Sequence, residues 1–394
     1  MKKKILFVIP SLRSGGAEKS LITLLSLMDY DKYDVDLLSF RRDGLFYDKI
    51  PPKVNVITGT EDYEVFDGGA KSAVIYFLKK GRLSSVADRI RYIHAYKESD
   101  PDLKVRKMWT LLKKQLPKVN EKYDCVIGYL EGNASSYAAD YENADKRICY
   151  VHSDIKKLGI NKKANTEAFE KCDVIVTVSQ ACADSIADEF PFAQSKTVVI
   201  ENITSARLLR ESAQEEKVFN KSGDENIIIT VGRFSHPKGI DLAVKAAKIL
   251  KEKGYDFKWY HIGNGELKAE IEALILSLGV ENEFILLGEK ANPYPYIGQC
   301  DIYVQPSRYE GKSIALDEAK CLCKPIVTTN FTTVADQIEN GVNGLVCEMN
   351  ENDIAEKIET LFNDEKLRKE LEKNLGKEKT GNEEEIEKFY AVLN

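Results

Sequence analysis

The chain has 394 residues, of which 43% are hydrophobic and 30% charged, and its formal net charge is −6 at pH 7. This length is enough for two domains, each with its own core. No apolar run approaches the ~20 residues of a membrane-spanning helix, which argues against an integral membrane protein. The opening KKKILFVIP is too short in its apolar part for a secretory signal, so we expect a first strand there.

The apolar runs alternate with helical stretches along the whole chain. Those of the first half are ILFVI, VDLLSF, CVIGYL, RICYVH and VIVTVS, and those of the second half are IIITVG, KWYHIG, FILLG, DIYVQ, PIVTT and GLVCE. Such runs have little polar alternation, as is typical of parallel strands covered by helices on both faces. The pattern therefore predicts an α/β protein with two doubly wound domains.

A glycine pair follows the first predicted strand, in PSLRSGGAEK. Gly15 and Gly16 allow close backbone approach, and the helix expected from Ala17 would point its positive end toward whatever binds there. The spacing is not GxGxxG, so a nicotinamide or flavin fingerprint is absent.

Residues 71–122 are strongly basic, with ten Lys and four Arg against three Asp and two Glu, a balance of +9 that leaves −15 for the rest of the chain. Aromatic and aliphatic residues such as Tyr96 and Trp109 lie among these charges. This composition suits an anionic membrane surface, and a solvated helical hairpin is the alternative. Nucleic acid is a weaker candidate partner, because no recognition motif accompanies the charge.

Two residues end neighbouring predicted strands of the first half: Glu131 follows CVIGYL and His152 follows RICYV. The histidine is either a hydrogen-bonded structural group or a residue that orders substrate hydroxyls together with Glu131. Asp154, in VHSD, is a further candidate.

The second half begins after a polar stretch at residues 201–226 and opens with the strand IIITVG. Arg233 and Lys238 follow that strand, five residues apart around a Pro-Lys-Gly turn. Two cations at the carboxyl end of a strand are well placed to neutralise a diphosphate. Solvated loop residues are the alternative interpretation.

The most informative stretch is SRYEGKSIALDEAK, directly after the strand DIYVQ. A strand that opens through a polar turn into a helix presents unpaired amides to a phosphate. Glu310 and Glu318 cannot bind that phosphate, but carboxylates suit hydroxyls. We therefore expect a nucleotide sugar, with the sugar near Glu310 and the ribose near Glu318, although two surface glutamates can share this spacing by chance.

Neither the cysteines nor the histidines indicate a metal site. The eight cysteines contain no CxxC pair and the four histidines no metal-ligand spacing, so we expect reduced core thiols in a cytoplasmic protein. DxD sequences occur at residues 29–31, 34–36 and 100–102, and we read all three as solvated. No metal and no cofactor are expected, because two cations and a helix start can replace a divalent ion.

Three motifs together resemble the retaining glycosyltransferases of family 4, which have the GT-B fold: GGAE after the first strand, VGR followed by PKG, and EGKSIALDE. The resemblance extends from about residue 4 to about residue 365, and VHSDIKKLG and KPIVTTNFTTVADQI are also similar to enzymes of bacterial capsular and surface polysaccharide synthesis. It implies two Rossmann-like domains that face a central cleft, an acceptor domain at residues 1–203 and a nucleotide-sugar domain at residues 204–375. A terminal segment at residues 376–394 would follow them, and its FYAVL would dock on the first domain.

The resemblance also implies roles for individual residues. Arg233 and Lys238 would bind the diphosphate, Glu318 the ribose and Glu310 the donor sugar, while His152 would lie near the transferred sugar. The phosphate would further contact the amides of Gly311, Lys312 and Ser313, with Gly16 approaching from the other domain. Gly15, Glu131 and Asp154 would contribute to the acceptor site.

The residues and this resemblance together imply a retaining, metal-independent hexosyltransferase that uses a nucleotide diphosphate sugar, UDP-linked by preference. Its acceptor would be a lipid-linked or oligosaccharide hydroxyl, and the enzyme would be cytoplasmic and peripheral on the inner face of the membrane. The alternative is a nucleotide-sugar-binding subunit of a polysaccharide assembly complex that has lost transfer activity, and a nucleotide-sugar epimerase of the same fold is a more distant one.

Overall fold

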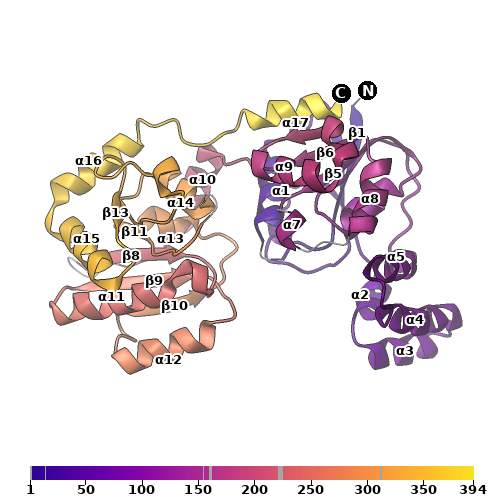
Figure 1. Ribbon diagram of the computed structural model, residues 1–394. Helices are drawn as coiled ribbons and strands as arrows, with labels where there is room; N and C mark the ends of the chain where they lie inside the picture. The colour runs from indigo at the N-terminus through magenta and orange to yellow at the C-terminus, as the bar shows by residue number, and fades with distance from the viewer. Residues whose placement is uncertain (1, 14, 154, 159–161, 221–224, 311–312) are drawn as a thin grey trace. The chain divides into compact units, whose positions relative to one another are not determined.

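The computed structural model describes residues 2–13, 15–153, 155–158, 162–220, 225–310 and 313–394 (Figure 1). The chain divides into two compact units, one formed by residues 1–203 together with 383–394, the other by residues 204–382. The first break lies at the expected residue, whereas the return of the chain to the first unit comes after residue 382 rather than after 375. Residues 376–382 stay with the second unit, where Glu378 binds Lys320 and Asn343, and Asn382 exchanges hydrogen bonds with Thr204.

Unit 1 is built on a seven-stranded sheet in the order β3-β2-β1-β4-β5-β6-β7, and every neighbouring pair is parallel. Its strands are β1 (Lys3–Ile9), β2 (Tyr33–Ser39), β3 (Asn55–Thr58), β4 (Tyr123–Gly128), β5 (Ala144–Val151), β6 (Val174–Thr177) and β7 (Thr197–Val199). The central strands are apolar on both faces because helices cover both, so alternate residues of β1 belong to separate hydrophobic clusters.

The helices of unit 1 include an excursion between β3 and β4 that carries most of residues 71–122. The α-helices are α1 (Gly16–Leu27), α2 (Glu61–Asp67), α3 (Ala70–Lys79), α4 (Leu83–Tyr96), α5 (Pro101–Leu112), α6 (Asn133–Ala139), α7 (Ile155–Leu158), α8 (Lys162–Lys171), α9 (Gln180–Glu189) and α17 (Glu385–Leu393). Short 3-10 turns lie at Tyr47–Lys49, Lys113–Gln115 and Pro191–Lys196. Figure 1 shows α3 and α4 at the end of the excursion, away from the sheet.

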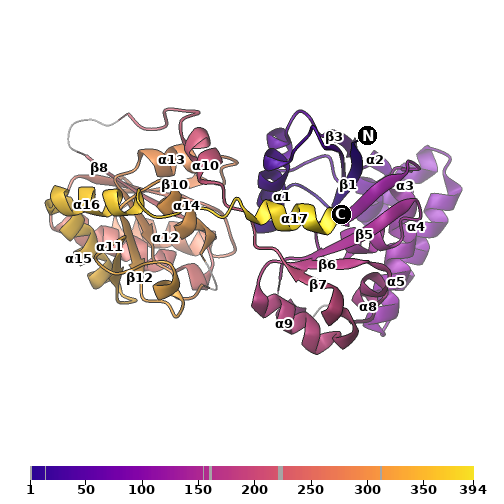
Figure 2. The same ribbon diagram turned by 90° about the horizontal axis from the view of Figure 1, so that it is seen from above.

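The terminal helix α17 returns to unit 1 and packs against the sheet (Figure 2). Phe389 is fully buried and stacks on Phe7, with ring centroids 6.0 Å apart. The ammonium group of Lys3 donates to the Leu393 carbonyl at 3.1 Å, and Lys146 donates to the preceding carbonyl at 2.9 Å. These bonds satisfy carbonyls at the negative end of the helix, which otherwise lack partners.

Unit 2 holds a six-stranded parallel sheet in the order β10-β9-β8-β11-β12-β13. The strands are β8 (Asn226–Val231), β9 (Phe257–Ile262), β10 (Phe284–Gly288), β11 (Ile302–Gln305), β12 (Ile326–Thr329) and β13 (Leu345–Cys347). The helices are α10 (Ala206–Ala213), α11 (Ile240–Glu252), α12 (Lys268–Leu278), α13 (Tyr294–Gln299), α14 (Ile314–Cys321), α15 (Glu351–Asn363) and α16 (Glu365–Leu375), with 3-10 turns at His236–Lys238 and Val334–Asp336. Two hydrophobic clusters fill the two sides of this sheet.

Three expectations from the sequence need correction. Strands β3 and β7 were not predicted, because both are short edge strands whose residues stay partly exposed and break the apolar run. Cys149 and Cys172 form a disulfide rather than two reduced thiols, since Cys149 lies on β5 and Cys172 just before the adjacent β6, with Cα atoms 6.4 Å apart. Asp36 is buried, not solvated, and accepts hydrogen bonds from Tyr123 and Asn55. In the described part of the chain no helix is long and apolar enough to cross a membrane.

Candidate functional site

Strands β8 and β11 lie side by side in unit 2 although they are far apart in the sequence. The strand order reverses between them, and ligands of open parallel sheets bind at the carboxyl ends of strands at such a reversal. The loop after β8 carries Arg233 and Lys238, and the loop after β11 carries Glu310. The fold therefore brings together side chains that are more than seventy residues apart in the sequence.

Lys238 and Glu310 form the central ion pair of this site. The lysine ammonium donates to both carboxylate oxygens at 2.8 Å. The side chain of Glu310 is 7% exposed and that of Lys238 is 28% exposed. The pair is thus largely sheltered from solvent screening but open on the side of the lysine, where a second anion can reach the ammonium.

A buried chain of hydrogen bonds fixes the carboxylate of Glu310. Its Oε1 accepts from Ser307 Oγ at 2.6 Å and from Gln305 Nε2 at 3.0 Å, in addition to Lys238. Gln305 in turn accepts from the hydroxyl of Tyr303 at 2.8 Å. Ser307, Gln305 and Tyr303 are all almost fully buried. One carboxylate oxygen with three donors has little rotational freedom, so Glu310 is preorganised.

Arg233 differs from Lys238 in its environment. Its side chain is 75% exposed, and its ion pair with Glu266 is long, at 3.5 Å. Of the two cations predicted to neutralise a diphosphate, Lys238 is held by a buried carboxylate and Arg233 is largely exposed.

The start of α14 has its own polar partners. The Ser313 side chain accepts from the Leu316 amide, as an N-cap does, and its own amide donates to Gln337 Oε1 at 2.9 Å. This amide, expected to bind phosphate, is therefore occupied by a side chain. Glu318 is buried on the same helix and accepts from the Tyr294 hydroxyl at 3.2 Å. Gly311 and Lys312 lie outside the described residues.

The candidate residues of unit 1 also gather at the carboxyl ends of adjacent strands. Glu131 follows β4 and His152 follows β5, and the His152 backbone amide donates to Glu131 Oε2 at 3.1 Å. The imidazole packs against Tyr129 and Tyr150, with ring centroids 5.0 and 5.6 Å away. The fold thus brings Glu131 and His152 together, as their strands predicted. Asp154 lies outside the described residues.

His152 is held as a neutral base. Both ring nitrogens are buried, and neither has a hydrogen-bond partner among the described residues. Burial lowers the pKa of His152 to about 4, against the opposing effect of Glu131. Asn202 and the Tyr129 backbone lie near enough to favour protonation but outside hydrogen-bond geometry. A buried polar ring without partners is costly, as is common at sites that bind a ligand.

The glycine pair begins helix α1, with Gly15 as the N-cap and Gly16 as the first helical residue. A Cβ added to Gly16 would meet no atom of the described residues within 4 Å, so packing among those residues does not require glycine there. Glu18, in the first turn, has a raised pKa because burial disfavours its charge and Glu131 repels it. Two carboxylates therefore belong to this cluster.

Several residues of these clusters were missed in the sequence analysis. They are Gln305, Ser307, Tyr294 and Gln337 in unit 2, and Glu18, Ser20 and Asn202 in unit 1, where Ser20 Oγ donates to Asn202 Oδ1 at 2.8 Å. Glu18 was part of the quoted GGAE motif, and Gln305 is a polar residue in an apolar strand, a signal that could have been used. The others depend on tertiary contacts that no spacing reveals.

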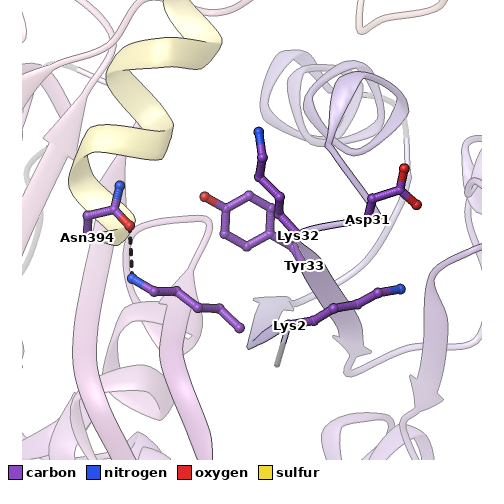
Figure 3. A pocket seen from close by; sticks show the side chains of 6 residues that line it. Lys2, Asp31, Lys32, Tyr33 and Asn394 are labelled. Atoms are coloured by element: carbon purple, nitrogen blue, oxygen red, sulfur yellow. Dashed lines mark hydrogen bonds between the residues drawn. The ribbon is translucent and has the colours of Figure 1, made fainter.

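Two further cavities lie in the described structure, one far from these clusters and one beside the loops that carry Lys238 and Glu310. One, of about 490 Å³, lies at the amino ends of β1 and β2 and is lined by Lys2, Lys3, Asp31, Lys32, Tyr33 and Asn394. Figure 3 shows these residues, and its dashed line is the bond from Lys3 to Asn394. Since unit 1 carries its candidate residues at the carboxyl ends of the strands, this cavity is at the opposite edge. The other, of about 380 Å³, lies in unit 2 between α11 and α12, behind the loop that carries Lys238.

Comparison with known proteins gives both a family match and a fold. Residues 211–378 match the family described as Glycosyl transferases group 1. The chain is 25% identical over 369 residues, 93% of this chain and 92% of the relative, to the N-acetylgalactosamine-N,N'-diacetylbacillosaminyl-diphospho-undecaprenol 4-alpha-N-acetylgalactosaminyltransferase of Campylobacter jejuni. It is 34% identical over 188 residues, 45% of this chain and 49% of the relative, to the capsular polysaccharide biosynthesis glycosyltransferase CapM of Staphylococcus aureus.

Among solved structures, HepE of Anabaena in complex with UDP-glucose superposes with a TM-score of 0.61 and 18% identity, covering 99% of this chain and 98% of HepE. Such a distant likeness shows the fold alone. It confirms the predicted fold class, two parallel-sheet Rossmann-like domains of the GT-B type.

Proposed function

We propose that this chain, whose residues 211–378 match the glycosyltransferase group 1 family, transfers a hexosyl group from a UDP-sugar to a hydroxyl of a lipid-linked or oligosaccharide acceptor in bacterial surface polysaccharide synthesis. The names of the Campylobacter and Staphylococcus relatives support the pathway and the acceptor class. The donor is proposed by analogy with HepE, a protein of the same fold whose structure contains UDP-glucose. We assign the chain to the retaining family 4 enzymes on its VGR, PKG and EGKSIALDE motifs.

The ion pair of Lys238 and Glu310 at the strand-order reversal carries this proposal. The ammonium, which has three N–H donors, can keep its contact with Glu310 and still donate to a diphosphate. Glu310, held by its buried partners, accepts from hydroxyls of the donor sugar, and Glu318 accepts from the ribose. Arg233 turns onto the phosphates from its exposed position.

The residues of unit 1 bind the acceptor in this proposal. His152 offers a nitrogen lone pair and an N–H to substrate hydroxyls, because its neutral imidazole is an acceptor on one side and a donor on the other. Glu131 orients the backbone of His152. Gly15 and Asp154 complete the acceptor contacts.

The reaction then requires stabilisation of the leaving group more than a nucleophile. As the glycosidic bond to the diphosphate breaks, negative charge develops on the phosphate, and the cations lower the energy of that state. The departing phosphate accepts the proton of the incoming hydroxyl on the same face of the sugar, so the anomeric configuration is retained. No metal is required for these steps, and we expect full activity in a chelator; activity that collapses and returns with manganese would contradict this.

A panel of nucleotide sugars tests the donor. Binding to the folded state raises the melting temperature by mass action, so the true donor stabilises the protein more than its competitors do. We expect a UDP-sugar to give the largest shift. Transfer is then followed by NMR of the product, whose anomeric configuration reports retention or inversion. A protein that binds the donor but transfers to no acceptor would favour the non-catalytic alternative.

We further propose that residues 71–122 hold the enzyme peripherally on the inner face of the cytoplasmic membrane. Helices α3 and α4 expose large apolar side chains beside their lysines and arginines, at Ile75, Leu78, Leu83 and Ile90, which are 45–69% exposed. Apolar contacts with the interface and attraction to anionic headgroups add to each other in such a segment.

Co-sedimentation with vesicles tests this surface. We expect binding to vesicles of phosphatidylglycerol, weakening as salt is raised, and little binding to phosphatidylcholine. Leu78→Glu with Leu83→Glu changes two exposed positions and should abolish sedimentation without altering thermal stability. Equal sedimentation of the variant would exclude this surface.

A further inference from the structure

The loops after β8 and β11 meet at the strand-order reversal of unit 2. A second ion pair, besides that of Lys238 and Glu310, joins the segments that form this junction. Arg308 donates from Nη1 and Nη2 to the two carboxylate oxygens of Asp241, both at 2.7 Å. The side chains are 25% and 32% exposed. Bidentate pairs of this geometry are among the strongest and most directional hydrogen-bonded contacts in proteins.

The backbone of the same segments is joined as well. The amides of Arg308 and Tyr309 donate to the Pro237 carbonyl at 2.7 and 3.2 Å. The Arg308 guanidinium also reaches the His236 carbonyl at 3.2 Å. The turn at residues 236–238 that carries Lys238 is therefore bonded on two consecutive carbonyls to the residues that precede Glu310.

Gly239 shows how closely the two loops approach. Its φ of 61° lies in the left-handed region, and a Cβ there would stand 2.0 Å from the Pro306 carbonyl oxygen. Any side chain would push the loops apart, so the contact itself requires glycine. It also ends the turn of Lys238 and begins α11, whose first turn supplies Asp241.

The charges of the second pair are mutually stabilised. Hydrogen bonding with Asp241 raises the pKa of Arg308. Burial opposes ionisation of Asp241, but the bonds with Arg308 outweigh it and the pKa of Asp241 lies below its ordinary value. Both groups stay charged at neutral pH, so the pair is a constant feature of the loop junction.

We propose that Arg308 and Asp241 are positioning residues of the donor site: they lock the 236–241 turn against the 305–310 loop and so hold Lys238 in register with Glu310 for a nucleoside diphosphate. This inference rests on the proposed donor site. Neither residue touches the diphosphate; both act through Lys238, whose Nζ lies 2.8 Å from Glu310.

A double-mutant cycle with UDP as the probe tests the inference. Arg308→Ala lowers UDP affinity by roughly tenfold, the size expected for one well-formed interaction. Arg308→Lys keeps the charge but not the bidentate geometry, and recovers only part of the affinity. In a Lys238→Ala background, Arg308→Ala has no further effect, because the residue it positions is gone. An equal loss in both backgrounds would overturn the proposal.

Lys251→Ala is the matched control. Lys251 forms a comparable ion pair with Glu283 at 2.9 Å in the same unit, with side chains 36% and 19% exposed, away from both loops. We expect it to lower the melting temperature as Arg308→Ala does and to leave UDP affinity unchanged.

Hydrogen–deuterium exchange of the ligand-free protein separates this inference from the proposed function. Arg308→Ala and Asp241→Ala should both speed amide exchange across residues 236–241 and 305–310, and Lys251→Ala should not. If the wild-type protein binds no UDP, the proposed donor is wrong. The exchange rates alone then show whether Arg308 and Asp241 hold residues 236–241 against residues 305–310. Unchanged exchange in Arg308→Ala would refute this inference.

Discussion

The candidate residues of the two units differ in how their polar groups are satisfied. In unit 2, Glu310 Oε1 accepts hydrogen bonds from Lys238, Gln305 and Ser307. In unit 1, both ring nitrogens of His152 are buried without a partner among the described residues. The carboxylate of Glu310 thus has its hydrogen-bond partners within its own unit. The imidazole of His152 has lost water on folding and has gained no hydrogen bond from the described residues in return.

This difference implies opposite effects of substitution on stability. Removing a member of a satisfied buried network leaves its partners unpaired and destabilises the fold, whereas replacing an unsatisfied polar group with an apolar one is neutral or stabilising. Residues kept at a cost in stability are typical of functional sites. Substitutions in the two units therefore test the comparison directly.

The largest effect is expected for Lys238→Ala. Removing one preorganised contact to the leaving group lowers turnover by ~10²–10³. The same change leaves Glu310 with two donors in place of three, so the melting temperature should fall as well. Turnover with a verified donor and differential scanning calorimetry give the two readouts. Wild-type turnover would show that Lys238 does not contact the diphosphate.

A smaller loss is expected for Gln305→Leu. The substitution leaves the buried hydroxyl of Tyr303 without its acceptor and removes a donor to Glu310, at a cost of about 1–3 kcal/mol in the free energy of unfolding. UDP affinity should fall less than in Lys238→Ala, since Glu310 keeps Lys238 and Ser307. Urea denaturation measures the first effect and calorimetric titration the second; an unaltered unfolding midpoint would contradict the role of the network.

The pH dependence of stability follows from two buried histidines, one in each unit. Burial lowers the pKa of His261 to about 3 and that of His152 to about 4, whereas both titrate near 6.5 in the unfolded chain. At a pH between the folded and unfolded pKa of each histidine, the unfolded chain binds more protons than the folded protein does. The free energy of unfolding therefore falls as the pH drops below about 6.5.

The slope of that loss is at most ~1.4 kcal/mol per pH unit for each histidine. Urea titrations at pH 7, 6 and 5 would measure it. His261→Gln should make the profile shallower, because the substituted residue does not titrate. An equal slope in the variant would show that His261 is not held neutral by the fold.

The smallest change, and the one of opposite sign, is expected for His152→Leu. We expect the free energy of unfolding to rise by about 1 kcal/mol, because an unsatisfied buried ring is replaced by an apolar side chain. Turnover should fall several-fold through the loss of a hydrogen bond worth ~1 kcal/mol, with UDP affinity unchanged. A destabilised variant with normal turnover would make His152 a structural residue.

The sequence predicted the core strands of both sheets because their apolar runs are continuous. It missed β3 and β7, whose partly exposed positions interrupt the pattern at the sheet edges. It also placed the residues that end central strands, such as Glu131 and His152, since parallel strands bring their carboxyl ends to one edge.

What the sequence could not predict are the contacts between segments far apart in the chain. The pairs of Lys238 with Glu310 and of Arg308 with Asp241 depend on β8 and β11 being neighbours. The disulfide of Cys149 and Cys172 depends likewise on β5 and β6 being neighbours. The sequence singled out Lys238 and Glu310 as candidates, but only the strand order shows that they are partners.

A crystal structure of the protein with UDP would show whether the ion pair of Lys238 and Glu310 binds the donor. We expect the diphosphate at the carboxyl ends of β8 and β11, with the Lys238 ammonium within hydrogen-bond distance of a phosphate oxygen and still bonded to Glu310. A nucleotide bound elsewhere, or a phosphate group that does not contact Lys238, would contradict it.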